Sequence, residues 1–194
     1  SIQWSAQLAD QLVSFGEPLP LLHLRQGRER QLGSHRPHRT RNDRLHLRLN
    51  VLAGGAEQVA PIEAIIKSWQ AALPDGRYIL DPVLGDGGRL YVDAAIVATM
   101  QQRLLPLAHI VTPNQFELSL LTNTNVKSVK SAMQAGRKML QQNPQLDAVI
   151  ATGISNIQAG VSDIKISRDD VTERSYTKRP HGIPGGGDLL TAIL

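Results

Sequence analysis

The chain of 194 residues is 41% hydrophobic and 20% charged, with no cysteine and a formal net charge of +4. This length suits one α/β domain around a single core and is short for two domains. The lack of cysteine excludes disulfides, thiolate metal sites and cysteine nucleophiles. Because no apolar run approaches the roughly 20 residues that span a bilayer, and the N-terminus has no signal-peptide pattern, we expect a cytoplasmic protein without membrane contacts.

The first predicted element is a short amphipathic helix over residues 5–15, and a strongly basic segment, residues 22–49, follows it. This segment holds eight arginines, two acids and four of the six histidines, so its local charge of +6 leaves the other 166 residues at −2. The basic character therefore belongs to one segment, and nucleic acid is not expected as a partner of the remaining chain. His35, His38 and His46 do not predict a metal site, since Pro37 interrupts the helix they would need.

Three interpretations of the basic segment stay open. Leu, Arg, His, Gln and Pro make up 21 of its 28 residues, and these five amino acids share codons that begin with cytosine. We therefore hypothesise a shifted reading frame or a damaged part of a gene. The alternatives are a disordered basic arm that binds nucleic acid or phosphates, and a solvated loop without a special role. We expect residues 1–50 to be aberrant or poorly ordered and residues 51–194 to form the folded domain.

From residue 57 onward the hydrophobic pattern alternates between strands and helices. Helices are predicted over residues 58–73, 93–105, 114–121 and 127–142, and buried strands over residues 77–83, 109–111 and 146–151. Residues 161–166 and 171–178 alternate like antiparallel or edge strands. This order predicts an α/β fold with a mostly parallel sheet covered on both faces, in which ligands bind beyond the carboxyl ends of the strands.

The three buried runs each end on a polar residue, at Asp81, Thr112 and Thr152. The first ending, Asp81-Pro-Val-Leu-Gly-Asp86, places two carboxylates in one turn and suits a hard cation such as Mg²⁺. An Asp-Pro turn whose second aspartate bonds its own backbone is the alternative. In the second ending, Thr112-Pro-Asn-Gln-Phe-Glu117, Thr112 or Asn114 could cap a helix, with Glu117 closing a capping box. The third, Thr152-Gly153, could contact phosphate or simply turn the chain.

The sequence Pro184-Gly-Gly-Gly-Asp188 leads into an apolar helical run. Free backbone N–H groups at the start of a helix stabilise an anion. Asp188 would ordinarily be an N-cap, but beside an anion pocket it could also take a proton from a substrate hydroxyl that attacks a phosphoryl group. Neither a Walker A motif nor a Gly-x-Gly-x-x-Gly dinucleotide motif is present, which disfavours P-loop and Rossmann sites.

These three motifs, in this order and at these separations, resemble the ribokinase-like superfamily and, within it, the pyridoxal kinase family. The resemblance runs from about Gly54 to Leu194 and is strongest in the phrase from Leu105 to Leu118. It implies a three-layer α/β kinase that transfers the ATP γ-phosphoryl group to the 5′-hydroxymethyl of pyridoxal, pyridoxine or pyridoxamine. It also implies Mg²⁺, a monovalent cation such as K⁺, and a homodimer.

Matched position by position, the resemblance implies a role for each motif residue. Asp188 would be the catalytic base that contacts the substrate, and Gly185, Gly186 and Gly187 would form the anion hole. ATP and its phosphates would be contacted by Asp81, Tyr91, Thr112, Asn114 and Thr152, and the metal by Asp86 and Glu117.

The chain also departs from the family pattern. Gly186 stands where threonine is usual and Gly153 where serine is usual. The family's first strand is not recognisable before residue 51, and the chain stops within the helix that Asp188 begins, so we expect a fold that is incomplete at both ends and shortened at the C-terminus. Two further readings are a hydroxymethylpyrimidine kinase, which shares fold and motifs, and a catalytically inactive kinase fragment.

Overall fold

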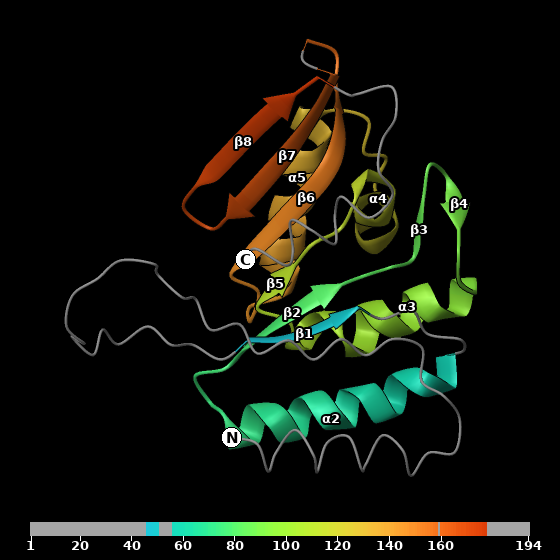
Figure 1. Cartoon of the computed structure of the whole chain (residues 1–194), viewed down its shortest axis with the longest axis vertical. Helices are drawn as coiled ribbons and strands as arrows, with labels where there is room; N and C mark the ends of the chain where they lie inside the picture. The colour runs from blue at the N-terminus through green and yellow to red at the C-terminus, as the bar shows by residue number, and fades with distance from the viewer. Residues whose placement is uncertain (1–45, 51–55, 159, 178–194) are drawn as a thin grey trace, which may run out of the picture.

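The computed structural model describes residues 46–50, 56–158 and 160–177, which form an α/β unit around one mixed sheet (Figure 1). The sheet has the strand order β1-β2-β5-β6-β7-β8. Its strands are β1 (His46–Asn50), β2 (Arg77–Asp81), β5 (Ile110–Val111), β6 (Ala148–Asn156), β7 (Gly160–Ser167) and β8 (Val171–Tyr176). A separate hairpin pairs β3 (Gly85–Asp86) with β4 (Arg89–Leu90).

The directions of the strands confirm the predicted sheet. The pairs β1–β2, β2–β5 and β5–β6 are parallel, whereas β6–β7 and β7–β8 are antiparallel. The parallel strands are joined by helical connections, and the antiparallel strands by short turns, as the two kinds of pairing require. The carboxyl ends of four parallel strands therefore meet at one edge of the sheet.

The described helices agree with the predicted ones to within a few residues. They are α2 (Val59–Ala72), α3 (Ala94–Arg103), α4 (Gln115–Thr122) and α5 (Val129–Gln142), with short 3-10 turns η1 (Ala56–Gln58) and η2 (Leu105–Leu107). Side chains cap three of the four: the Asp93 carboxylate accepts from Ala95 N, and Asn114 and Ser128 form capping boxes. None of the helices in the described ranges is long and apolar enough to cross a membrane.

One face of the sheet carries the main core. Leu80, Val111, Val149 and Ile166 share this face through the strand register and are fully buried. Apolar side chains of the four helices pack into the same cluster, among them Ile66, Ile96, Met100, Leu118 and Met139. On the opposite face, Ile79 and Ile150 are also buried, at 2% and 6% exposure. Both faces of the central strands are thus shielded from water.

Strand β1 was not predicted from the sequence. It pairs in parallel with β2 from His46↔Arg77 to Asn50↔Asp81, so the end of the basic segment contributes a strand to the sheet. Residues 46–50 were predicted to belong to the N-terminal region, outside the folded domain. The predicted helix over residues 5–15 and residues 22–45 of the basic segment lie outside the described residues.

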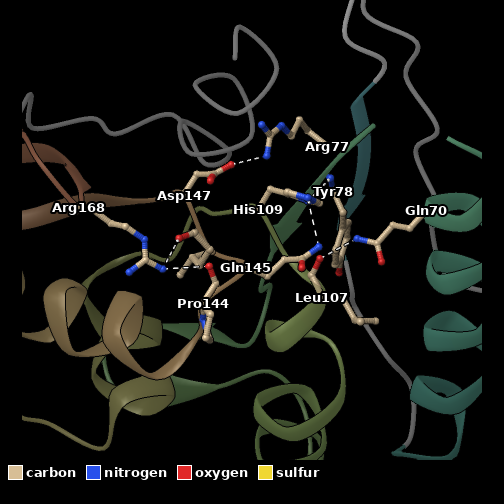
Figure 2. A network of polar contacts seen from close by, with 10 residues as sticks. Gln70, Arg77, Tyr78, Leu107, His109, Pro144, Gln145, Asp147 and Arg168 are labelled. Atoms are coloured by element: carbon tan, nitrogen blue, oxygen red, sulfur yellow. Dashed lines mark hydrogen bonds and ion pairs between the residues drawn. The ribbon is translucent and has the colours of Figure 1, made fainter. Parts of the chain in front are cut away.

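A polar network closes the opposite edge of the sheet, where the parallel strands begin (Figure 2). The His109 Nδ1 atom accepts the Tyr78 backbone N–H at 3.1 Å, and the His109 carbonyl accepts the Asp147 N–H at 2.8 Å. Arg77 and Asp147 form an ion pair at 2.6 Å, and Arg168 donates to the Pro144 carbonyl at 3.0 Å. These contacts connect β2, β5 and β6 at their amino ends. The carboxyl ends of the same strands lie at the other edge of the sheet.

Candidate active site at the carboxyl edge of the sheet

Asp81 and Thr112 meet at the carboxyl ends of two neighbouring strands, as the sequence analysis expected. Asp81 is the last residue of β2, and Thr112 follows β5 directly. The Thr112 hydroxyl donates to Asp81 Oδ1 at 3.2 Å, and the Thr112 N–H donates to the Leu80 carbonyl at 3.0 Å. Both side chains are buried, at 7% and 4% exposure. The candidate site therefore begins with a buried, hydrogen-bonded pair at the carboxyl edge of the sheet.

Asn114 and Glu117 form the predicted capping box at the start of α4. Asn114 Oδ1 accepts the Glu117 N–H at 3.0 Å, and Glu117 Oε2 accepts the Asn114 N–H at 2.9 Å. The Asn114 amide also donates to the Gly85 carbonyl at 2.7 Å. This hydrogen bond connects the start of α4 to the β3–β4 hairpin. The capping motif alone did not predict this connection.

The carboxylate of Glu117 is buried and has a perturbed pKa. Its Oε1 atom accepts the Leu84 N–H at 3.0 Å, in addition to the capping contact of Oε2. Burial raises the pKa of Glu117 to about 7, and the negative charge of nearby Asp81 raises it further, while the backbone N–H donors oppose the shift. Two carboxyl groups thus share a region of low dielectric at the strand ends, which is typical of functional sites.

Asp86, unlike Asp81 and Glu117, is not buried. Its side chain is exposed on the β3–β4 hairpin, and its Oδ1 atom accepts the Gly87 N–H at 2.7 Å. This local bond is the alternative that the sequence analysis left open for the turn. The close approach of the hairpin to α4 requires Gly85, because a Cβ there would lie 2.2 Å from the Arg89 carbonyl oxygen and 2.8 Å from the Phe116 ring.

The remaining two described candidates, Tyr91 and Thr152, lie at different depths. The Tyr91 side chain is 59% exposed, and its backbone N–H donates to the Leu84 carbonyl at 2.8 Å. Thr152 is half-buried and lies beside Asn114, to which it forms an isolated parallel bridge. The Thr152 N–H donates to the Pro113 carbonyl at 2.9 Å, which joins the third strand to the loop after the second.

The expectation that the third buried strand ends at Thr152 was wrong. β6 continues to Asn156 after an irregularity in its pairing between Ala151 and Ile154. Gly153, with φ of 64°, adopts the left-handed conformation that permits this irregularity. Residues beyond it pair with β7 in a hairpin, and Thr152 and Gly153 interrupt the hydrophobic run from which the strand was predicted.

An open cavity of about 760 Å³ adjoins the site. It is lined by the β3–β4 turn, α4, the α4–α5 loop and β6, including Asp86, Gln115, Lys127 and Ser155. The Gln115 side chain accepts the Ser155 N–H at 2.6 Å and donates to the Val126 carbonyl at 3.1 Å. These two hydrogen bonds of Gln115 were not predicted from the sequence, although the residue lies inside the motif between Thr112 and Glu117.

Several candidate residues cannot be placed. Asp188, Gly185, Gly186 and Gly187 lie outside the described residues. Within the described part of the chain, no group of three or more histidine, aspartate or glutamate side chains could hold a metal ion on its own. Mg²⁺ at a phosphate site needs fewer protein ligands, because substrate phosphates and water supply the others. The carboxylates of Asp86 and Glu117, the two predicted metal ligands, offer oxygen atoms of the kind that Mg²⁺ prefers.

Comparison with known proteins supplies the family context. The family model for phosphomethylpyrimidine kinase matches residues 53–194. A putative pyridoxal kinase of Schizosaccharomyces pombe is 30% identical over 146 residues, which are 73% of this chain and 47% of that protein. The pyridoxal kinase of Arabidopsis thaliana is 30% identical over 152 residues, 75% of this chain and 49% of that protein. The chain therefore spans about half the length of the curated relatives it matches.

The fold matches solved structures as well. The pyridoxal kinase of Entamoeba histolytica superposes with a TM-score of 0.67 at 24% sequence identity, over 76% of this chain and 52% of that chain. A second structure of that enzyme, described as holding PLP, gives a TM-score of 0.66. At this level of identity, the match supports the ribokinase-like α/β fold expected from the motifs.

Proposed function

The chain belongs to the phosphomethylpyrimidine kinase family, and from that premise we propose that it phosphorylates B6 vitamers with ATP. The acceptor is the 5′-hydroxymethyl group of pyridoxal, pyridoxine or pyridoxamine. Its oxygen forms a bond to the γ-phosphorus, the bond from that phosphorus to the bridging oxygen of ADP breaks, and the hydroxyl proton passes to a base. The products are the 5′-phosphate, such as pyridoxal 5′-phosphate, and ADP.

The observation that carries this proposal is the gathering of Asp81, Thr112, Asn114, Glu117 and Thr152 at one sheet edge. These residues come from the ends of two strands, the bulge in β6 and one helix start, and backbone or side-chain hydrogen bonds and one β-bridge connect them. Phosphoryl transfer needs positioning and charge stabilisation more than covalent chemistry, and hydroxyl, amide and carboxylate groups on a rigid scaffold provide both. Relatives about 30% identical to the chain are named pyridoxal kinases.

In the proposed site, the phosphates of ATP lie along the strand ends. The hydroxyl of Thr152 and the amide of Asn114 donate hydrogen bonds to phosphate oxygens, while the single proton of the Thr112 hydroxyl is donated to Asp81. Asp81 orients the Thr112 hydroxyl through their 3.2 Å contact. The exposed ring of Tyr91 covers the nucleotide from the hairpin side.

Asp86 and Glu117 would hold Mg²⁺ together with the phosphates and water. The cation supplies charge neutralisation for the phosphoryl group in transit. Glu117, whose pKa is raised to about 7, becomes fully ionised when a positive charge lies beside it. A monovalent cation such as K⁺ is proposed from the resemblance alone, and replacing K⁺ with Na⁺ in the assay tests it.

Asp188 is proposed as the base, and the glycine turn before it as the anion hole. The support is the sequence pattern, three glycines and a carboxylate at the start of an apolar helical run. Backbone N–H groups there would stabilise the charge on the transferred phosphoryl oxygens, while the Asp188 carboxylate accepts the proton of the substrate hydroxyl.

The proposal is tested by incubating the purified chain with pyridoxal and Mg-ATP and measuring pyridoxal 5′-phosphate. We expect turnover in the wild type and a loss of at least about 100-fold in Asp188→Asn, because a general base contributes 10²–10⁴-fold. Asp169→Asn is the matched control, since Asp169 is exposed in the turn between β7 and β8. Absence of product from the wild type, with no nucleotide binding, would favour the inactive-fragment reading.

A hydroxymethylpyrimidine kinase is the second candidate, because the matching family model carries the phosphomethylpyrimidine kinase description. Both reactions phosphorylate a hydroxymethyl group on a nitrogen heterocycle. Both would use the same phosphate-binding and metal-binding residues at the carboxyl edge of the sheet. Competition between pyridoxal and hydroxymethylpyrimidine in one assay separates them. The proposal stands where kcat/KM is higher for the B6 vitamer and fails where the pyrimidine is preferred.

We also propose a cytoplasmic homodimer. The cytoplasmic setting is supported by the lack of cysteine, which suits a reducing compartment, and the dimer by the family resemblance. Light scattering on the purified chain tests the oligomeric state, and a mass near 21.2 kDa would contradict the dimer.

A further inference from the structure

The irregularity in β6 is a bulge with a single residue opposite it. Pairing with β7 passes from Ala151↔Ile164 to Ile154↔Ser162, so Thr152 and Gly153 together face Asp163. Bulges of this kind redirect a side chain and leave backbone groups without ladder partners. Because Thr152 is one of the proposed phosphate-binding residues, whatever holds this bulge also sets the position of the Thr152 hydroxyl.

Asp163 supplies the missing hydrogen-bond partner. Its Oδ1 atom accepts the Gly153 N–H at 2.9 Å and the Tyr176 hydroxyl at 2.9 Å. The three residues lie on the adjacent strands β6, β7 and β8, which run side by side in Figure 1. A carboxylate that receives two donors from two neighbouring strands is fixed in place more firmly than one with a single local contact.

The Tyr176 hydroxyl keeps the proton that it donates to Asp163. Partial burial raises the pKa of Tyr176 to about 12, and the hydrogen bond to Asp163 and its negative charge raise it as well. The phenol therefore keeps its proton at neutral pH and anchors the carboxylate from the β8 side.

Glycine suits position 153 because of the backbone conformation there, and not because a side chain would collide with its neighbours. Its φ of 64° lies in the left-handed region, while a Cβ built there would meet no atom within 4 Å. The neighbouring Thr152 side chain is half-buried, and its hydroxyl has no hydrogen bond to another residue in the described part of the chain. Because no hydrogen bond of its own holds this hydroxyl, its position depends on the backbone of the bulge.

Resting on the proposed function, we propose that Asp163, anchored by Tyr176, is a positioning residue that holds the Gly153 bulge and so fixes the Thr152 hydroxyl against a nucleotide phosphate. Asp163 itself touches neither the phosphate nor the acceptor. It acts through the Gly153 N–H, whose hydrogen bond requires an acceptor oxygen at this position.

The kinetic test compares Asp163→Ala, which removes the acceptor, with Asp163→Asn, which keeps an oxygen able to accept both hydrogen bonds. Loss of one ground-state phosphate contact raises the KM for ATP about fivefold in Asp163→Ala, with kcat changed less than about twofold. Asp163→Asn and the exposed-turn control Asp169→Ala stay within about twofold of the wild type. An unchanged KM in Asp163→Ala, or equal damage in Asp163→Asn, overturns the proposal.

A second readout does not depend on activity. Amide hydrogen exchange of the full chain reports the Gly153 N–H directly, and we expect it to exchange at least about tenfold faster in Asp163→Ala than in the wild type and Asp163→Asn. The Val149 and Ile164 amides monitor the intact sheet. If Asp163→Ala does not fold, Tyr176→Phe takes its place, with a smaller acceleration. An unchanged Gly153 rate overturns the proposal.

The two readouts keep the two claims separate. A wild-type chain that binds no nucleotide overturns the proposed function and, with it, the phosphate contact of Thr152. The exchange rates of Gly153 then still decide whether Asp163 holds the bulge.

Discussion

At the residue scale, Glu117 gives the site a pH-dependent component of stability. Its pKa is raised from 4.5 to about 7, so between these values the folded protein binds more protons than the unfolded chain. The contribution of Glu117 is therefore fully present below pH 4.5 and is lost as the pH rises to about 7, by about 3 kcal/mol at most. Urea unfolding at pH 5 and pH 8 measures this change.

The variant Glu117→Gln isolates that component. The amide keeps one oxygen as a hydrogen-bond acceptor but cannot ionise, so we expect it to lose less stability between pH 5 and pH 8 than the wild type. Glu57→Gln is the control, because Glu57 is exposed in η1. Parallel pH dependences of the wild type and Glu117→Gln would contradict the assignment.

The hydroxyl of Tyr78 is a polar group without a partner in the core. Its side chain is fully buried, and its oxygen has no hydrogen-bond partner in the described structure. An unsatisfied buried hydroxyl costs about 1–3 kcal/mol, so Tyr78→Phe should leave the free energy of unfolding unchanged or raise it by about 1 kcal/mol. Tyr176→Phe, which removes a donor to Asp163, should lower it. Urea unfolding at one pH compares both, and a clear loss of stability in Tyr78→Phe would refute the account.

At the element scale, neutral His109 joins three strands at the amino edge of the sheet (Figure 2). Its Nδ1 atom must be unprotonated to accept the Tyr78 N–H. Burial lowers the pKa of His109, and the charge of Arg77 lowers it further, while Asp147 opposes the shift. Because the folded-state pKa lies below the unfolded value of 6.5, stability from this group is present above pH 6.5 and is lost on acidification.

His109→Gln tests this role, since glutamine offers an acceptor that does not titrate. Between pH 7 and pH 5.5, we expect the wild type to lose about 1 kcal/mol more stability than His109→Gln. Thermal unfolding in both buffers gives the comparison. Equal losses in the two proteins would show that protonation of His109 does not destabilise the folded state.

Local pattern predicted most elements but not their continuation or their pairing. The helix α4 was anticipated because Asn114 and Glu117 carry a capping signal that acts within four residues. Strand β1 was missed because its sequence has only two apolar residues, Leu47 and Leu49, in a basic context, and its pairing with β2 is a long-range contact. The extension of β6 past Gly153 was missed for a different reason, since Thr152 and Gly153 interrupt the hydrophobic run that marked the strand.

The sequence predicted which strand ends contribute to the site but not how its side chains are held. The strand-end rule anticipated the location of Asp81 and Thr112, because parallel strands bring their carboxyl ends to one edge wherever they occur in the chain, but it did not predict their hydrogen bond. The bracing by Gln115 and the anchoring by Asp163 were not anticipated. Each depends on which side chain lies opposite which backbone group after folding, and no local spacing encodes that.

At the scale of the whole molecule, the candidate site joins β2, the β3–β4 hairpin, α4 and β6, so a ligand bound there should stabilise the fold as a unit. A ligand present at about 100 times its Kd adds about 2.7 kcal/mol. For a chain of this length, Mg-ATP at that excess should raise the Tm by roughly 5–10 °C. ATP with a chelator should raise it less, because the phosphates then lack the cation that Asp86 and Glu117 would share. A Tm that does not respond to Mg-ATP would argue against nucleotide binding by this chain, whatever its fold.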